Sequence, residues 1–343
     1  MTKWIDLELL ERKVILQQVA DKEHLPEYAI EKDWWVSMTL KALFQTSCKD
    51  YLEFKGGTSL SKGWHLIDRF SEDIDLALNY RFFVFRLDNN TQLKNLRKKS
   101  RKFIVDTLAE DLDSNLKALG LSGYEVKPEV NDDAGNPISS DADPTVIYVN
   151  YSSVSSDASP YVPPRVKVEI SCLSMDEPFE MRDISSIISS YYPDDDQESN
   201  CSIPVVLPSR TFLEKAFLLN EEFQKEEPRS LRMTRHLYDL ERLMDTEFGL
   251  KALSDMELYG RIVEHRRKFY HVGYADYDKD YPEMIDFLPP ERCVKQWKAD
   301  YGEMLTHFVY GRSLSFEELL VRIAELQNRF RNMGRGLMPF ENQ

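Results

Sequence analysis

The sequence has few cysteines and no long apolar run. Its four cysteines, Cys48, Cys172, Cys201 and Cys293, lie far apart and form no C-x-x-C pair. This spacing disfavours a zinc site and predicts small buried side chains in a reducing compartment. No stretch approaches the roughly 18 apolar residues that a membrane helix needs, and the N-terminus has no secretory apolar segment. We therefore expect a cytoplasmic protein that begins at its natural N-terminus and does not bind a membrane.

Several catalytic signatures are also missing. The sequence has no G-x-S-x-G motif and no Walker A motif, and its six histidines contain no H-x-x-x-H pair, which disfavours a histidine metal site. The chain has 343 residues, 42% of them hydrophobic, which is enough for one large folded domain or two ordinary ones. The net charge of −15 argues against a grip on long duplex DNA, but it permits a local basic patch.

The hydrophobic periodicity changes near residue 207. Before it, short alternating runs predict strands between helices, and after it the apolar spacing is almost entirely helical. We predict an α+β domain over residues 1–207 and a helical domain over residues 208–343. The expected helices are 5–22, 29–44, 59–67 and 91–119, and the expected strands are 51–54, 73–78, 146–151, 165–171 and 203–207.

A strand runs into two glycines and then into a helix at Phe54-Lys-Gly-Gly-Thr-Ser-Leu60. Glycine allows backbone N–H groups to approach an anion closely, and a helix N-terminus adds a partial positive charge. The Ser59 hydroxyl can donate to a phosphate oxygen. By itself this pattern is also that of an ordinary tight turn.

Two carboxylates, Asp73 and Asp75, lie two residues apart on the next predicted strand, so both side chains leave the same face of that strand. Ile74 and Leu76 take the other face, toward a core. Adjacent carboxylates repel each other unless a cation binds them, and hard oxygen ligands suit Mg²⁺. The alternative is a solvated strand face.

A third carboxylate, Glu169, lies on the alternating strand of residues 165–171. If this strand pairs beside the strand of Asp73 and Asp75, the three carboxylates form a site that can hold two metal ions. Such a site clamps the attacking and leaving oxygens of a phosphoryl displacement. An ordinary exposed glutamate is the alternative.

The order of these elements resembles the DNA polymerase β nucleotidyltransferase superfamily, and specifically the AbiEii/AbiGii toxin family. The resemblance spans roughly residues 28–245 and lies in segments 31–36, 54–62, 69–76, 211–216 and 235–240. It implies a polymerase β-like domain, a mixed sheet flanked by helices, followed by a helical domain that contributes to the active-site cleft. One departure is His236, where the family often has aspartate.

The resemblance also implies site residues. Gly56, Gly57, Thr58 and Ser59 would bind the nucleotide triphosphate, and Asp73 and Asp75, with Glu169 less securely, would bind Mg²⁺. Lys215 and Asp239 match active-site positions in the two C-terminal motifs, with Lys215 also contacting the nucleotide.

The residues themselves are compatible with this assignment of Lys215 and Asp239. Thr211 and Glu214 fit a capping box, which places Lys215 in the first turn of a helix, where a ligand anion would explain a cation. A solvent-facing lysine is the alternative for Lys215. A helical ion pair with Arg235 is the alternative for Asp239.

Two basic stretches stand out as possible RNA contacts. One is the helix that carries Lys94, Arg97, Lys98, Lys99, Arg101 and Lys102, and the other is the aromatic stretch 261–271. A solvated helix face and ordinary packing are the alternatives.

We therefore predict a Mg²⁺-dependent enzyme that transfers a nucleoside monophosphate from an NTP to tRNA or another RNA. The resemblance implies that it is the toxin of a toxin–antitoxin pair, with a cognate antitoxin encoded nearby. A second hypothesis keeps the reaction but makes the acceptor a protein or a small molecule. A third is an inactive nucleotide-binding module.

Overall fold

The chain forms two compact units in this computed structural model, which describes residues 4–83, 86–87, 89–155, 162–174, 177–270 and 273–333. Unit 1 comprises residues 1–65 and 70–206, and unit 2 comprises residues 66–69 and 207–343. The short segment 66–69 lies in unit 2 because its side chains pair there. Arg69 contacts Asp239, and Asp68 contacts Arg242 at 2.7 Å.

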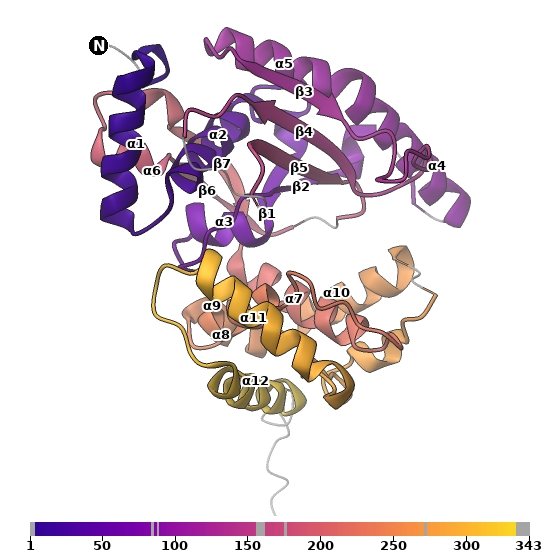
Figure 1. The fold of residues 1–343 in the computed structure, drawn as a ribbon. Coiled ribbons are helices and arrows are strands. Elements are labelled where there is room, and N and C mark those ends of the chain that lie inside the picture. Colours follow the sequence, from indigo (N-terminus) through magenta and orange to yellow (C-terminus); the bar gives the residue numbers. More distant parts are fainter. Residues whose placement is uncertain are drawn as a thin grey trace, which may run out of the picture. The chain divides into compact units, whose positions relative to one another are not determined.

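Unit 1 is built on a mixed seven-stranded sheet in the order β3-β4-β5-β2-β1-β7-β6 (Figure 1). The central strands β2 and β5 are parallel, and so are β1 and β7, whereas the other neighbours are antiparallel. The predicted mixed sheet is therefore confirmed. The strands are β1 (Leu52–Lys55), β2 (Ile74–Leu78), β3 (Tyr124–Pro128), β4 (Thr145–Tyr151), β5 (Arg165–Ser171), β6 (Phe179–Ile184) and β7 (Cys201–Val206).

The helices of unit 1 bury one face of this sheet. Helix α2 packs against β5 and α5 packs against β3, with α4 continuing α5 in the N-terminal direction through the helical turn η4 (Figure 1). The apolar side chains of β2 and β5 that meet this layer, such as Ile74 and Val168, are fully buried. The helices are α1 (Leu9–Glu23), α2 (Glu27–Leu43), α3 (Gly56–Lys62), α4 (Asn90–Phe103), α5 (Ala109–Ala118) and α6 (Ile187–Tyr191), with η4 at Ile104–Leu108.

Unit 2 is helical, as its apolar spacing predicts. Its core is aromatic, with Phe212 stacked on Phe330 at 5.7 Å between ring centroids and Phe287 edge-on to Phe330 at 5.2 Å. Its helices are α7 (Pro208–Glu222), α8 (Thr234–Leu243), α9 (Glu247–Ser254), α10 (Met256–Phe269), α11 (Val294–His307) and α12 (Phe316–Arg331).

Several sequence predictions need correction. Strands β3 and β6 were not predicted, and α3 begins at Gly56 instead of Ser59. Helix α7 begins at Pro208, the proline occupying its first turn, so the predicted capping box from Thr211 does not start the helix. Lys215 consequently lies in the middle of α7. Residues 156–160, between the predicted strands 146–151 and 165–171, and His271 of the basic stretch 261–271 lie outside the described residues.

The cysteine and membrane predictions can also be compared with the structure. All four cysteines are free; Cys48, Cys172 and Cys293 are buried, and Cys201 is partly exposed. Across the described helices, none is both long enough and apolar enough to span a membrane.

Candidate active site

The turn from β1 into α3 brings Gly56 against the side chain of Asp75. Gly56 has a positive φ of 81°, and a β-carbon added there would lie 2.0 Å from Oδ2 of Asp75. No L side chain fits this position, since both the backbone conformation and the available space require glycine. Gly56 and Asp75, which lie 19 positions apart in the sequence, are therefore in direct contact.

Asp75 and Glu169 are register partners on the parallel strands β2 and β5. On the other side of β2, Lys55 is the antiparallel partner of Asp75. Register partners point to the same face of a sheet, about 4.8 Å apart along the hydrogen-bonding direction. The carboxylates of Asp75 and Glu169 thus leave one face together with the Lys55 side chain, as the pairing of the two predicted strands requires.

Asp73 belongs to the same face. It is half-buried like Asp75, and the intervening Ile74 is fully buried. Burial disfavours the charged form of Lys167, but Glu169 at 2.7 Å, and then the charge of Asp73, raise the lysine pKa above its usual value. Asp73 is therefore close enough to Lys167 for its charge to raise the pKa of that lysine.

Thr58 and Ser59 use their hydroxyls inside the protein. The Thr58 hydroxyl donates to the carbonyl of Asp73 at 2.5 Å, and the fully buried Ser59 hydroxyl donates to the carbonyl of Gly56 at 2.9 Å. Thr58 thus holds the turn to the strand of Asp73. The surface left for a phosphate in this turn is the backbone of Gly56 and Gly57, both partly exposed.

The carboxylates of this face fit a Mg²⁺ ion by their chemistry. Mg²⁺ usually binds one or two carboxylates and takes its other ligands from waters and substrate phosphates. Within the ranges that the structure describes, no three His, Cys, Asp or Glu side chains gather closely enough to hold a metal by themselves. Asp73 and Asp75 flank the buried Ile74 on this face and are the proposed ligands, and the metal site stays a prediction.

Three consecutive charged residues of α2 are buried and tie the parts of this site together. The Lys32 ammonium pairs with Glu72, the residue before Asp73, and donates to the carbonyl of Pro163 at 3.1 Å. The Asp33 carboxylate accepts from Lys62 of α3 at 2.5 Å and from the backbone N–H of Ile187 at 2.7 Å.

The third residue of this trio, Glu31, accepts from the backbone N–H of Val154 at 2.6 Å and from the Ser153 hydroxyl at 2.5 Å. The sequence predicted no role for Glu31, Lys32 or Asp33. The available signal was three adjacent charges inside an otherwise apolar helix.

Lys215 and Asp239 meet in unit 2. Their charged groups are 2.8 Å apart, and the second oxygen of Asp239 accepts from Arg69 Nε at 2.7 Å, with Asp239 fully buried. Asp239 of α8 is therefore held by cations from two other segments, Arg69 and Lys215. Arg69 opens the segment 69–76 that carries the family resemblance, but the sequence did not predict its contact with Asp239.

The pKa values in this cluster follow from burial and charge. Burial, and then the charge of Arg69, lower the pKa of Lys215, although Asp239 opposes this shift. Burial would raise the pKa of Asp239, but Arg69 and Lys215 hold it well below its usual range. Burial and the charge of Lys215 lower the pKa of His236 well below its usual value, so this histidine is neutral.

Residues 39–322 match the family described as nucleotidyl transferase AbiEii toxin, type IV toxin–antitoxin system. A turn with two glycines, two aspartates on the next strand and a carboxylate on its parallel neighbour are the features expected of a nucleotidyltransferase. The chain belongs to the AbiEii family and is a nucleotidyltransferase toxin of a type IV toxin–antitoxin system. Membership implies a nucleotide substrate and a cognate antitoxin.

The fold is similar to that of MenT4, a nucleotidyltransferase toxin from Mycobacterium tuberculosis. The TM-score is 0.51 at 16% sequence identity, and the similarity covers 94% of this chain and 91% of MenT4. No curated protein matches the sequence. The likeness to MenT4 confirms the predicted fold class.

Proposed function

We propose that this chain is a Mg²⁺-dependent enzyme that transfers a nucleoside monophosphate from an NTP to a hydroxyl of tRNA or another RNA. The observation that carries the proposal is the position of Asp75, which contacts the Gly56 turn and is in register with Glu169. A triphosphate lying on this turn would have carboxylates beside it. An acidic face of this kind needs a cation to accept an anionic substrate.

Each residue of the face has a role in this proposal. The backbone N–H groups of Gly56 and Gly57 orient the triphosphate, and Asp73 and Asp75 hold the cation. When bound, Mg²⁺ neutralises the charge that develops on the phosphate oxygens and on the leaving pyrophosphate. Lys55, the register partner of Asp75, adds a positive charge at the edge of the same face.

We assign Glu169 as the general base that takes the proton from the acceptor hydroxyl. The acceptor oxygen forms a bond to the α-phosphorus, the bond to pyrophosphate breaks, and the hydroxyl proton passes to the Glu169 carboxylate. Asp239 is a poorer base because it is fully buried between two cations and its pKa is well below the usual range. We also propose that the helical domain, residues 208–343, contributes Lys215 to catalysis.

The test is transfer of label from each α-³²P-labelled NTP to bulk tRNA in the presence of Mg²⁺. We expect the wild type and Asp50→Asn, which changes an exposed aspartate outside this face, to label RNA with one of the four nucleotides. Asp75→Asn should reduce labelling by at least about 100-fold. Absence of both labelling and NTP binding with all four nucleotides would contradict the proposal.

The alternative acceptors are a protein or a small molecule. The net charge of −15 favours them somewhat over RNA. Labelled protein or a labelled low-mass product in place of labelled RNA, detected by mass spectrometry of a total extract, would establish this alternative.

A further inference from the structure

One short segment of unit 1 is strongly basic, although the chain as a whole is acidic. Residues 80–103 contain eight lysines and arginines and a single acidic residue, Asp88, in a protein whose net charge is −15. Four aromatic residues lie in the first part of the segment, and the second part forms α4. A basic stretch of this density in an acidic protein marks a local surface for a polyanion.

The structure separates the basic side chains that support the fold from those that face solvent. Arg101 is buried and donates to the carbonyl of Glu129 at 2.9 Å, and Lys99, although exposed, donates to the carbonyl of Phe83 at 3.5 Å. Lys94, Lys98 and Lys102 are also exposed, and the side chains of Lys94 and Lys102 are 58% and 81% exposed. These three residues form what we call the lysine row.

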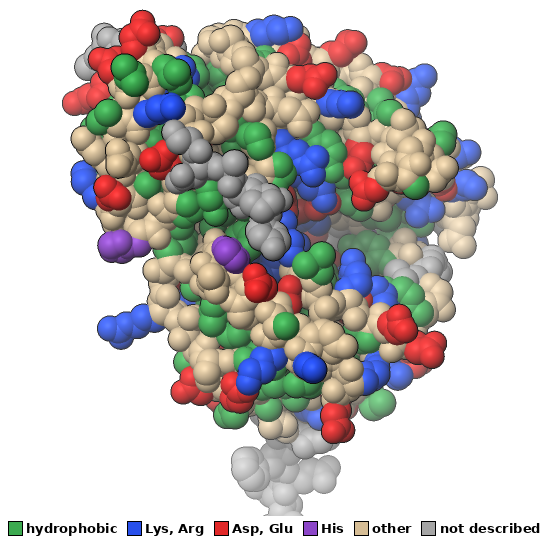
Figure 2. Space-filling model, in the orientation of Figure 1, with side chains coloured by type: hydrophobic (Ala, Val, Ile, Leu, Met, Phe, Trp, Pro, Cys, Tyr) green, Lys and Arg blue, Asp and Glu red, His purple; other side chains and the backbone are tan. Residues whose placement is uncertain are grey.

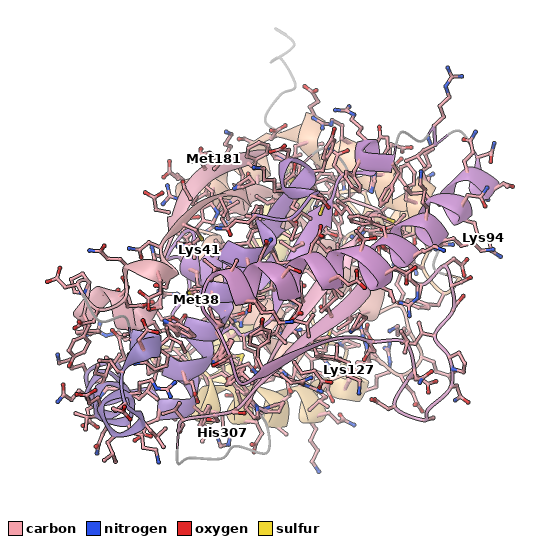
Figure 3. All side chains as sticks on the ribbon, turned by 90° about the horizontal axis from the view of Figure 1, so that it is seen from above. Met38, Lys41, Lys94, Lys127, Met181 and His307 are labelled. Atoms are coloured by element: carbon pink, nitrogen blue, oxygen red, sulfur yellow. The ribbon has the colours of Figure 1, made fainter. Side chains whose placement is uncertain are left out.

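The lysine row follows one side of α4. Its members are four residues apart, so they succeed one another about every 6 Å along the helix axis and span about 12 Å. Figure 3 shows Lys94 on the outer side of α4, and Figure 2 shows blue side chains along the right-hand edge, where Figure 1 draws this helix. Two members of the row have an acidic neighbour at the outer limit of ion-pair distance, with Asp106 3.9 Å from Lys102 and Asp141 4.0 Å from Lys94.

A chain of contacts connects α4 to the end of the strand that carries Glu169. Asp143 accepts from the Ser171 hydroxyl at 2.6 Å, and Ser171 follows Glu169 by two residues on β5. Two residues before Asp143, the Asp141 carboxylate lies 3.7 Å from Arg97 of α4. The lysine row therefore lies on the same unit as the proposed catalytic face, and the segment 141–143 connects its helix to the strand that carries Glu169.

We propose that the lysine row binds the phosphate backbone of the RNA acceptor. The residues around the row, such as Thr91 and Asn95, are polar, so α4 has no exposed apolar patch for a protein partner. Lysine is depleted in the cores of protein interfaces, whereas phosphate backbones are bound by such rows of ammonium groups. The inference rests on the proposed function, since it supplies the docking surface for its RNA acceptor.

The test compares two triple variants of equal charge change. Lys94→Gln/Lys98→Gln/Lys102→Gln removes the row, and Lys251→Gln/Lys279→Gln/Lys295→Gln removes three exposed lysines of unit 2. Binding of a fluorescent 20-nucleotide oligouridylate and of bulk tRNA is measured between 50 and 300 mM salt. We expect the row variant to bind about tenfold more weakly, with a salt slope lower by about 2, and the control to bind like the wild type.

The outcomes separate this inference from the proposed function. RNA labelling by a row variant whose affinity and salt slope equal those of the wild type would overturn the docking surface and leave the reaction standing. RNA binding through the row without label transfer would support the surface and count against the reaction. An equal loss in both triple variants would show general attraction to positive charge and overturn the inference.

Discussion

The Oδ2 atom of Asp75 lies 2.0 Å from the point where a β-carbon of residue 56 would stand. Glycine at position 56 is therefore a condition for the carboxylate to reach the turn. The same residue has a φ of 81°, which L side chains rarely adopt. A β-carbon at position 56 would therefore prevent the turn from approaching the Asp75 carboxylate this closely.

Gly56→Ala should lower both stability and transfer activity. The clash with Asp75 adds to the backbone strain, so we expect a loss of about 3 kcal/mol in the free energy of unfolding and most of the activity. Gly120→Ala is the matched control, because Gly120 has a φ of 90° and an added β-carbon there meets nothing within 4 Å. It should cost about 1 kcal/mol and leave kcat unchanged. Equal effects of the two substitutions, measured by urea unfolding and label transfer, would contradict this view of Gly56.

The buried pair of Lys32 and Glu72 should behave as a coupled unit. Either Lys32→Met or Glu72→Met leaves one charge buried alone, and we expect each to cost about 3–5 kcal/mol, whereas the double variant should cost less than the sum. The double variant should fold but lose kcat more than NTP affinity, because Glu72 precedes Asp73. Removing the exposed pair of Arg267 and Asp278 should leave the unfolding midpoint and kcat unchanged. Additive losses in the cycle would show that the two residues are not coupled.

Asp239→Asn should destabilise unit 2 at neutral pH, because Arg69 and Lys215 would then be buried beside a neutral amide. The expected cost is about 3–5 kcal/mol. The pKa of Asp239 is lowered in the folded state, so its contribution is present above the usual carboxyl pKa and is lost as the pH falls below it. Hydrogen exchange of α7 and α8 peptides should therefore show a gap between wild type and variant that narrows below about pH 4. A gap that widens on acidification would contradict the assignment.

Local patterns in the sequence predicted the parts of the site that depend on strand alternation. Arg165–Ser171 is the predicted strand without change, and Asp73 and Asp75 flank the buried Ile74 as expected. Such predictions succeed because a period of two decides which face each side chain takes. The register of Asp75 with Glu169 depended on the pairing of two strands almost a hundred residues apart, and only the structure supplies it.

Predictions that needed tertiary context were less successful. The apolar spacing of residues 5–22 predicted a helix, and α1 forms over most of that range, but Leu9, Leu10 and Val14 are 51%, 76% and 51% exposed. Asp239 contacts Lys215 and also Arg69, which is 170 positions away, whereas the helical rule offered only a residue four positions away. Rules based on helical spacing consider only residues three or four positions apart, so they cannot predict contacts at this separation. Buried charged side chains in particular often pair with residues far away in the sequence.

The buried Asp280 carboxyl should make the stability of unit 2 depend on pH. Its side chain is fully buried, Oδ1 accepts from Asn220 at 2.7 Å, and Oδ2 has no hydrogen-bond partner. Burial, and then the charge of Glu221, raise its pKa to about 7, although Arg266, Asn220 and Arg267 oppose the shift.

Because the folded state holds this proton more tightly than the unfolded chain, stability should fall as the pH rises from about 4 to 7. The loss is at most about 4 kcal/mol. Asp280→Asn keeps the amide contact from Asn220 through its oxygen and cannot ionise, so it should be more stable than the wild type at pH 8 and nearly equal to it at pH 4.

Hydrogen exchange of α7 and α10 peptides at pH 5, 6, 7 and 8 measures the stability of unit 2 alone. Tryptophan fluorescence would report mainly on unit 1, since Trp297 is the single tryptophan after residue 206. Asp255→Ala removes the side chain that caps α10 and accepts from the N–H of Leu258 at 2.8 Å, so it should lower protection throughout this range. A wild type whose protection is flat from pH 5 to 8 would show that Asp280 is already ionised at pH 5, with its charge balanced by Arg266.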